Sequence, residues 1–112
     1  MLLIITASHQ KNLVLAETVS AAATATGIDN RVLDLTSLDI PVYSSRQHEA
    51  GPGQDFEQLQ SAMISATGIW VCAAEYNGGV PPVLGSAIAW LSTECEDFRE
   101  MFTGLPVALS TH

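Results

Sequence analysis

Short apolar runs alternate with amphipathic helical segments along most of the chain, and this alternation limits the folds that the chain can adopt. The runs cover residues 2–6, 31–35, 69–73 and 106–109. Apolar runs of this length are typical of strands that are covered on both faces, as in a parallel sheet. The run at residues 31–35 is the weakest of them, but its Val32, Leu33 and Leu35 still favour burial.

Three helices are expected between these strands, at residues 12–26, 55–67 and 82–92. Each carries an apolar stripe at helical spacing. The stripes comprise Leu15, Ala16, Val19 and Ala23; Phe56, Leu59, Met63 and Ala66; and Leu84, Ala87, Ile88 and Leu91. Asn12 is expected to cap the first helix, Gly27 to end it, and Pro82 to begin the third. This order predicts an α/β fold with a parallel sheet and right-handed crossovers.

The composition predicts one globular domain, residues 1–112, and excludes several kinds of partner. The formal charge is −8, with four Lys and Arg residues in total. Nucleic acids and anionic membranes bind basic surfaces, so neither is an expected partner. An anionic ligand would have to be held by backbone N–H groups at a helix N-terminus.

No metal site, disulfide framework or targeting segment is expected. The two cysteines, Cys72 and Cys95, are read as free thiols, and the histidines at positions 9, 48 and 112 have no metal-binding spacing. The apolar run at the N-terminus is too short for a signal peptide, and no run reaches membrane-spanning length. These features predict a cytoplasmic protein without a membrane partner.

Ligands of parallel α/β sheets bind outside the carboxyl ends of the strands, which directs attention to residues 7–12, 74–79 and 110–112. The first loop leads from a strand into a helix, where free N–H groups and the helix dipole favour an anion such as a phosphate. Ser8, Lys11 and Asn12 could add a hydroxyl, a positive charge and an amide. Taken alone, this loop also fits an ordinary strand-to-helix connection.

The second loop, residues 74–79, contains a turn dipeptide, Asn77-Gly78, next to a second glycine. Glycines here would let the backbone approach a flat ligand closely. The residues alone equally suit a plain turn, with Tyr76 covering the edge of the core.

Residues 75–84, Glu-Tyr-Asn-Gly-Gly-Val-Pro-Pro-Val-Leu, continuing through residues 87–92, Ala-Ile-Ala-Trp-Leu-Ser, resemble the signature of the NAD(P)H-dependent FMN reductase family. Residues 104–111 resemble the family's fourth strand and the start of its third flavin loop. The resemblance implies a flavodoxin-like three-layer sandwich with strand order 2-1-3-4. It also implies that the chain is short at its C-terminus, without the family's final strand and helices.

The same resemblance implies a set of cofactor-binding residues. The FMN phosphate would be surrounded by Ser8, Gln10, Lys11 and Asn12. The isoalloxazine ring would be lined by Glu75, Tyr76, Asn77 and Gly78, with Ser110 as a further contact. No catalytic side chain is implied, because the flavin carries the chemistry.

The implied activity is that of an FMN-dependent oxidoreductase. It would pass a hydride from NAD(P)H through FMN to a small acceptor such as a flavin, quinone or azo compound. Two alternatives remain. One is a flavodoxin-type electron carrier. The other is a non-catalytic flavodoxin-like fragment with weak or no FMN binding, which is favoured by Ala7 and Gln10 standing where the family usually has glycine and arginine.

A homodimer or homotetramer is expected. Val107 and Leu109 lie on a strand whose apolar run requires burial on both faces, yet that strand would stand at the sheet edge. Trp90 on the third helix suits either packing or an interface, and together with Leu91 it is a candidate contact face between subunits. The carboxylates at positions 94, 96, 97 and 100 are expected to be a solvated surface.

Overall fold

Four parallel strands form the sheet in a computed structural model that describes residues 1–8 and 10–111. They are β1 (Leu2–Thr6), β2 (Asn30–Asp34), β3 (Gly68–Cys72) and β4 (Val107–Ser110). Within the described residues their order is β2-β1-β3-β4, and every neighbouring pair is parallel. The predicted strands and the predicted order 2-1-3-4 are confirmed, with boundaries that differ by about one residue at most ends.

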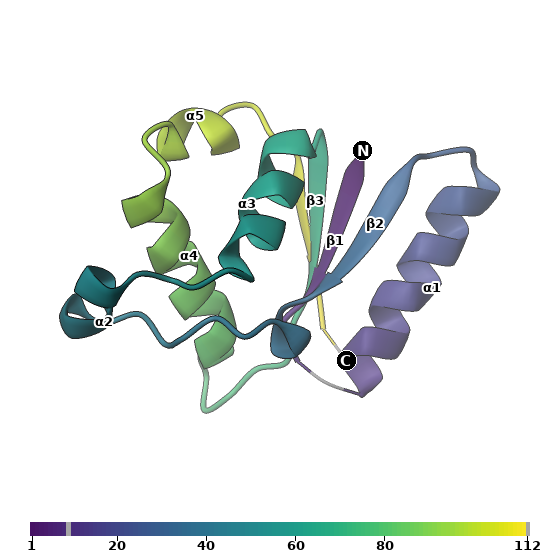
Figure 1. Ribbon diagram of the computed structural model, residues 1–112. Coiled ribbons are helices and arrows are strands. Elements are labelled where there is room, and N and C mark those ends of the chain that lie inside the picture. Colours follow the sequence, from purple (N-terminus) through teal and green to yellow (C-terminus); the bar gives the residue numbers. More distant parts are fainter. Residues whose placement is uncertain (9, 112) are drawn as a thin grey trace.

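Helices cover the two faces of this sheet and complete three layers (Figure 1). Helix α1 (Lys11–Ala25) lies on one face, and α3 (Phe56–Ser65), α4 (Pro82–Glu94) and α5 (Phe98–Phe102) lie on the other. This doubly wound arrangement is the expected flavodoxin-like fold. Across the described part of the chain, every helix is too short or too polar to cross a membrane.

The core has two parts, one on each face of the sheet, because alternate strand residues point to opposite faces. One part is larger than the other. Leu3 and Ile5 of β1 pack toward α3 and α4 in the large cluster, together with Leu59 and Trp90. Ile4 of β1 packs on the other face against α1 in a smaller cluster. The buried stripe residues of the three predicted helices face these two clusters, but Ile88 is 44% exposed.

The start of α1 differs from the sequence prediction. Gln10 occupies the N-cap, whereas Asn12 lies inside the first turn with its side chain only 3% exposed. Asn12 is therefore not the cap that its residue type suggested. The predicted end of the helix is confirmed, because Thr26 follows the last turn and Gly27 leaves it at a φ of 78°.

Two short helices were not predicted. Helix α2 (Ser45–Ala50) lies in the long connection from β2 to α3, which begins with a 3-10 turn, η1 (Leu35–Ser37). None of the α2 residues is buried, and residues 45–50 show no apolar periodicity from which a helix could be predicted. Ser44 caps the helix, because its Oγ accepts a hydrogen bond from the Gln47 amide. Helix α5 follows the acidic run, and its aromatic residues pack on the core.

The expected contact face on α4 is wrong for Trp90 and Leu91. Their side chains are 0% and 3% exposed, so both belong to the interior of this chain. The indole N–H of Trp90 donates to the carbonyl of Pro41 at 2.7 Å, and Tyr43 packs edge-on against the ring. Trp90 thus holds the segment before α2 against α4.

Candidate functional site

The carboxyl ends of β1, β3 and β4 lie at one end of the sheet, the lower end in Figure 1. Backbone bonds continue the ladder beyond the strands: Ala7 donates to the carbonyl of Cys72 at 3.0 Å, and Ala73 donates to that of Ser110 at 3.1 Å. A side-chain bond joins the next residues, because the Ala74 amide donates to Ser8 Oγ at 2.7 Å. The three loops singled out from the sequence therefore start side by side.

A cavity of about 530 Å³ opens between the loop after β3 and the end of β4. Most of its lining is apolar, including Val71, Leu84 and Leu109. Its polar groups come from the two loops: Glu75, Ser110 and Thr111. An apolar cavity with a few convergent polar groups is the usual form of a cofactor site.

The predicted ring-contacting residues divide into two groups. Glu75, Gly78 and Ser110 line the cavity. Tyr76 and Asn77 do not; they are exposed and belong to a tight turn in which Tyr76 and Gly79 exchange two backbone hydrogen bonds of 2.9 Å.

The predicted phosphate-binding residues lie in the connection from β1 to α1 and in the first turn of α1, outside the cavity lining. Gln10 and Lys11 are exposed, whereas Ser8 and Asn12 are 4% and 3% exposed. Asn12 Oδ1 is buried and has no hydrogen-bond partner. His9 lies outside the described residues.

The connection from β1 to α1 and the loop after β3 each contain a non-glycine residue in the left-handed region. Among the described residues, Gln10 and Asn77 are the non-glycine positions with positive φ, at 60° and 51°. At Gln10 this conformation costs about 1–3 kcal/mol and persists only where the surrounding structure enforces it, whereas Asn-Gly turns accept a positive φ at Asn77 readily. Both residues lie in loops that were expected to bind flavin.

The sequence reasoning missed three residues of the site: Ala74, Trp70 and Thr111. Ala74 binds Ser8 through its backbone, a role that residue type cannot indicate. Trp70 donates its indole N–H to Ser110 Oγ at 2.9 Å, so Ser110 is held by β3. Thr111 lines the cavity beside Ser110 but was not selected. Its position in the loop after the last strand was the available signal.

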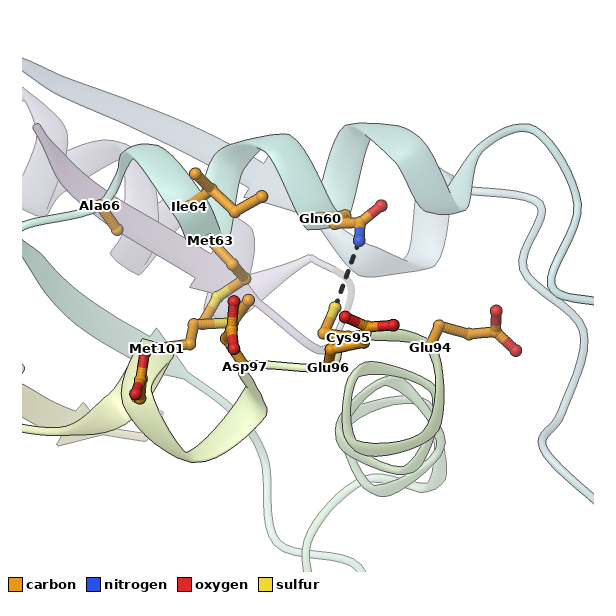
Figure 2. Close-up of a pocket in the computed structure, with 10 residues that line it drawn as sticks. Gln60, Met63, Ile64, Ala66, Glu94, Cys95, Glu96, Asp97 and Met101 are labelled. Atoms are coloured by element: carbon orange, nitrogen blue, oxygen red, sulfur yellow. Dashed lines mark hydrogen bonds between the residues drawn. The ribbon is translucent and has the colours of Figure 1, made fainter.

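A larger hollow of about 700 Å³ lies between α3 and α5 (Figure 2). Cys95 accepts a hydrogen bond from Gln60 Nε2 at 3.4 Å inside it, and Met63 and Met101 face each other across it. Its remaining lining includes the predicted solvated carboxylates of residues 94, 96, 97 and 100, all of which are exposed. These charges would repel an anionic cofactor.

The acidic residues of that hollow do not form a metal centre. In the described ranges, no three His, Cys, Asp or Glu side chains gather in an arrangement that could hold a metal ion. The smaller cavity at the carboxyl ends of the strands is therefore the better candidate for a cofactor, although it is not the largest.

Solved structures with the same fold include two oxidoreductases. FerB from Paracoccus denitrificans, a flavoenzyme NAD(P)H:(acceptor) oxidoreductase, superimposes with a TM-score of 0.76 at 18% identity, over 98% of this chain and 59% of that one. An oxidoreductase from Corynebacterium diphtheriae gives a TM-score of 0.69 at 18% identity, over 98% and 62%. The chain thus spans about three fifths of each, and likeness at this identity shows the fold.

The sequence itself identifies the family. None of the curated proteins matches the chain significantly. The model of the NADPH-dependent FMN reductase family matches residues 1–111, which includes every loop at the candidate site. The chain therefore belongs to the NADPH-dependent FMN reductase family.

Proposed function

We propose that the chain is a single FMN-binding domain that passes a hydride from NAD(P)H through FMN to a small-molecule acceptor. Membership of the family implies FMN as cofactor and NAD(P)H as co-substrate. The observation that carries the proposal is the joining of the loops after β1, β3 and β4 beside the 530 Å³ cavity, with the Ser8–Ala74 bond between the first two.

The start of α1 suits the phosphate end of FMN. Free N–H groups and the dipole of this 15-residue helix favour an anion there. Lys11 adds a positive charge. The amide of Asn12 carries a buried oxygen without a protein partner, and an amide can accept from a ligand hydroxyl or, turned about its last torsion, donate to a phosphate oxygen. A buried polar group of this kind requires a partner, and a ligand can supply it.

The cavity suits the ring end of FMN. Its apolar lining would cover the faces of a flat aromatic group, and the Gly78–Gly79 backbone leaves room for close approach. Glu75 and Ser110 would supply polar contacts at its edge. Tyr76 is 50% exposed and would have to turn inward to contact the ring.

In this proposal the protein binds, orients and shields, and no side chain moves a proton. FMN, when bound, is the group that accepts and donates the hydride. Lys11, Asn12 and the α1 N-terminus would fix one end of it, while the loop after β3 would fix the other. The open side of the cavity would admit the nicotinamide and then the acceptor: a flavin, a quinone or an azo compound.

A non-catalytic module with weak or no FMN binding is the second candidate. It is favoured by the charge of the site, because Lys11 is the only Lys or Arg in the three loops. Gln10, an uncharged residue, forms the N-cap beside it. The phosphate would then depend mainly on backbone groups.

The two candidates differ in the visible spectrum. We expect the purified protein, after addition of FMN and removal of excess, to keep a flavin spectrum that NADPH bleaches under anaerobic conditions and a quinone restores. A protein that retains FMN but does not respond to NADPH or NADH would support a binding module. A protein that cannot be coloured by FMN would refute the proposed function.

We also propose that the chain forms a homodimer or homotetramer. Val107 and Leu109 on β4 are 54% and 78% exposed, and β4 is the last strand on its side of the described sheet. Exposed apolar residues on a strand edge favour association. Pairing of subunits along β4 would cover Val107, and bound FMN would cover part of Leu109, which also lines the cavity.

A cytoplasmic location is proposed on chemical grounds. Cys72 and Cys95 are both free and buried, as is usual for proteins of a reducing compartment. NAD(P)H is a co-substrate of such compartments. A reporter fusion of the natural protein followed by cell fractionation would test the location.

A further inference from the structure

The side chain of Ser8 joins the connection that follows β1 to the loop that follows β3. This side chain is 4% exposed, and its Oγ accepts the Ala74 amide at 2.7 Å across 66 residues of sequence. The backbone of Ser8 is fixed as well, because the fully buried hydroxyl of Thr6 donates to its carbonyl at 2.8 Å. Ser8 is therefore anchored on β1 and binds the chain that leaves β3.

Ala74 is the residue at which the loop after β3 leaves the sheet. The preceding amide, that of Ala73, still donates to the carbonyl of Ser110 on the β4 side. The next backbone bonds are those of the Tyr76–Gly79 turn, which are internal to the loop. The bond from Ala74 to Ser8 is thus the attachment of this loop on the β1 side, and it sets the direction in which residues 75–79 continue.

We propose that Ser8 is a positioning residue for the ring-binding loop and acts on flavin affinity through Ala74. This inference rests on the proposed function, since it names a residue of the same site. A serine hydroxyl has one donor and two acceptor positions, and here one acceptor position is used by the loop. Loss of the hydroxyl leaves the Ala74 N–H without its partner and frees the loop, so the effect falls on the ring end of the ligand.

The test compares FMN with riboflavin, which has the same ring and ribityl chain but no phosphate. We expect Ser8→Ala to weaken both ligands by the same factor, about tenfold, the loss that follows when a part-buried N–H is left unpaired. Lys11→Met, at an exposed position of the phosphate turn, should weaken FMN and leave riboflavin unchanged. Ser92→Ala is the matched control, because its hydroxyl is exposed and bonds only within α4.

A loss for FMN with no loss for riboflavin in Ser8→Ala would overturn the inference and make Ser8 a phosphate ligand. A second measurement needs no ligand: amide hydrogen exchange by NMR in the flavin-free protein. The Ala74 amide should be protected, and in Ser8→Ala, if it folds, that protection should be lost. Rapid exchange of the wild-type amide would refute the Ser8–Ala74 attachment.

These two measurements also separate this inference from the proposed function. If the wild type binds neither flavin, the proposed function fails. The Ala74 exchange then still decides whether Ser8 holds the loop.

Discussion

Replacing Asn77 by proline should abolish the turn that presents the loop after β3 to the cavity. Asn77 and Gly78 have φ angles of 51° and 79°, and the flanking Tyr76 and Gly79 exchange two backbone hydrogen bonds of 2.9 Å. Positive φ at both central residues is the requirement of a type I′ turn. Proline fixes φ near about −65°, so Asn77→Pro cannot adopt this turn.

The size of the effect follows from the two bonds that close the turn. Each contributes about 0.5–1.5 kcal/mol, so their loss makes the bound form of the loop less favourable by roughly 1–3 kcal/mol. At about 1.4 kcal/mol per factor of ten, the Kd for FMN should rise roughly fivefold to a hundredfold. Asn77 is exposed, so the core should remain intact.

Asn77→Gly is the matched variant, because glycine reaches positive φ without steric cost while losing the side chain. We expect its Kd for FMN to stay close to that of the wild type if the backbone of the turn is what matters. Quenching of flavin fluorescence gives both constants, and thermal unfolding confirms that both variants fold. Equal affinity of the proline and glycine variants would refute the reasoning. A large loss in the glycine variant alone would assign the contact to the Asn77 side chain.

Three further outcomes are expected. Trp90→Phe should lower the free energy of unfolding by about 1–3 kcal/mol in urea titrations, because the Pro41 carbonyl loses its donor inside the core; unchanged stability would contradict the role given to this bond. Val107→Lys should change the stability of the monomer by less than about 0.5 kcal/mol and reduce self-association in light scattering, since Val107 is 54% exposed and lies outside the lining of the flavin cavity; association equal to that of the wild type would exclude β4 as the interface. Asn12→Asp should weaken FMN about tenfold or more at low salt but riboflavin much less, because a carboxylate would face the phosphate; equal losses for the two ligands would move the phosphate away from α1.

The fold was predictable because the elements that define it are repetitive. Residues 2–5 and 69–73 are apolar throughout, and both runs lie in central strands with a helix layer on each face. The stripe that includes Leu59 and Met63 identified α3 correctly. Helix α2 buries none of its residues and therefore needs no apolar stripe. Ser44, a residue type common at helix starts, is the local signal that the sequence offers for it.

The convergence of the loops at the candidate site was predictable from the sequence, but the contacts inside that site were not. The rule that ligands bind beyond the carboxyl ends of parallel strands selected three loops that the structure brings together beside the cavity. The bond from Ala74 to Ser8 spans 66 positions and uses a backbone group, so no local pattern encodes it. Trp90 illustrates the same limit: an aromatic residue beside a helical stripe suits either an interface or a core, and the distant Pro41 carbonyl decides for the core.

Mapping FMN by NMR tests the central claim most directly, because the two large hollows lie in different places on the molecule. Titration of the isotope-labelled protein with FMN should shift the amides of residues 75–79, 110 and 111 around the cavity and those of Lys11 and Asn12 at the start of α1. The amides around Cys95 in the hollow between α3 and α5 should remain unchanged. Shifts concentrated around Cys95, or along the loop at residues 37–54, would contradict the site described here.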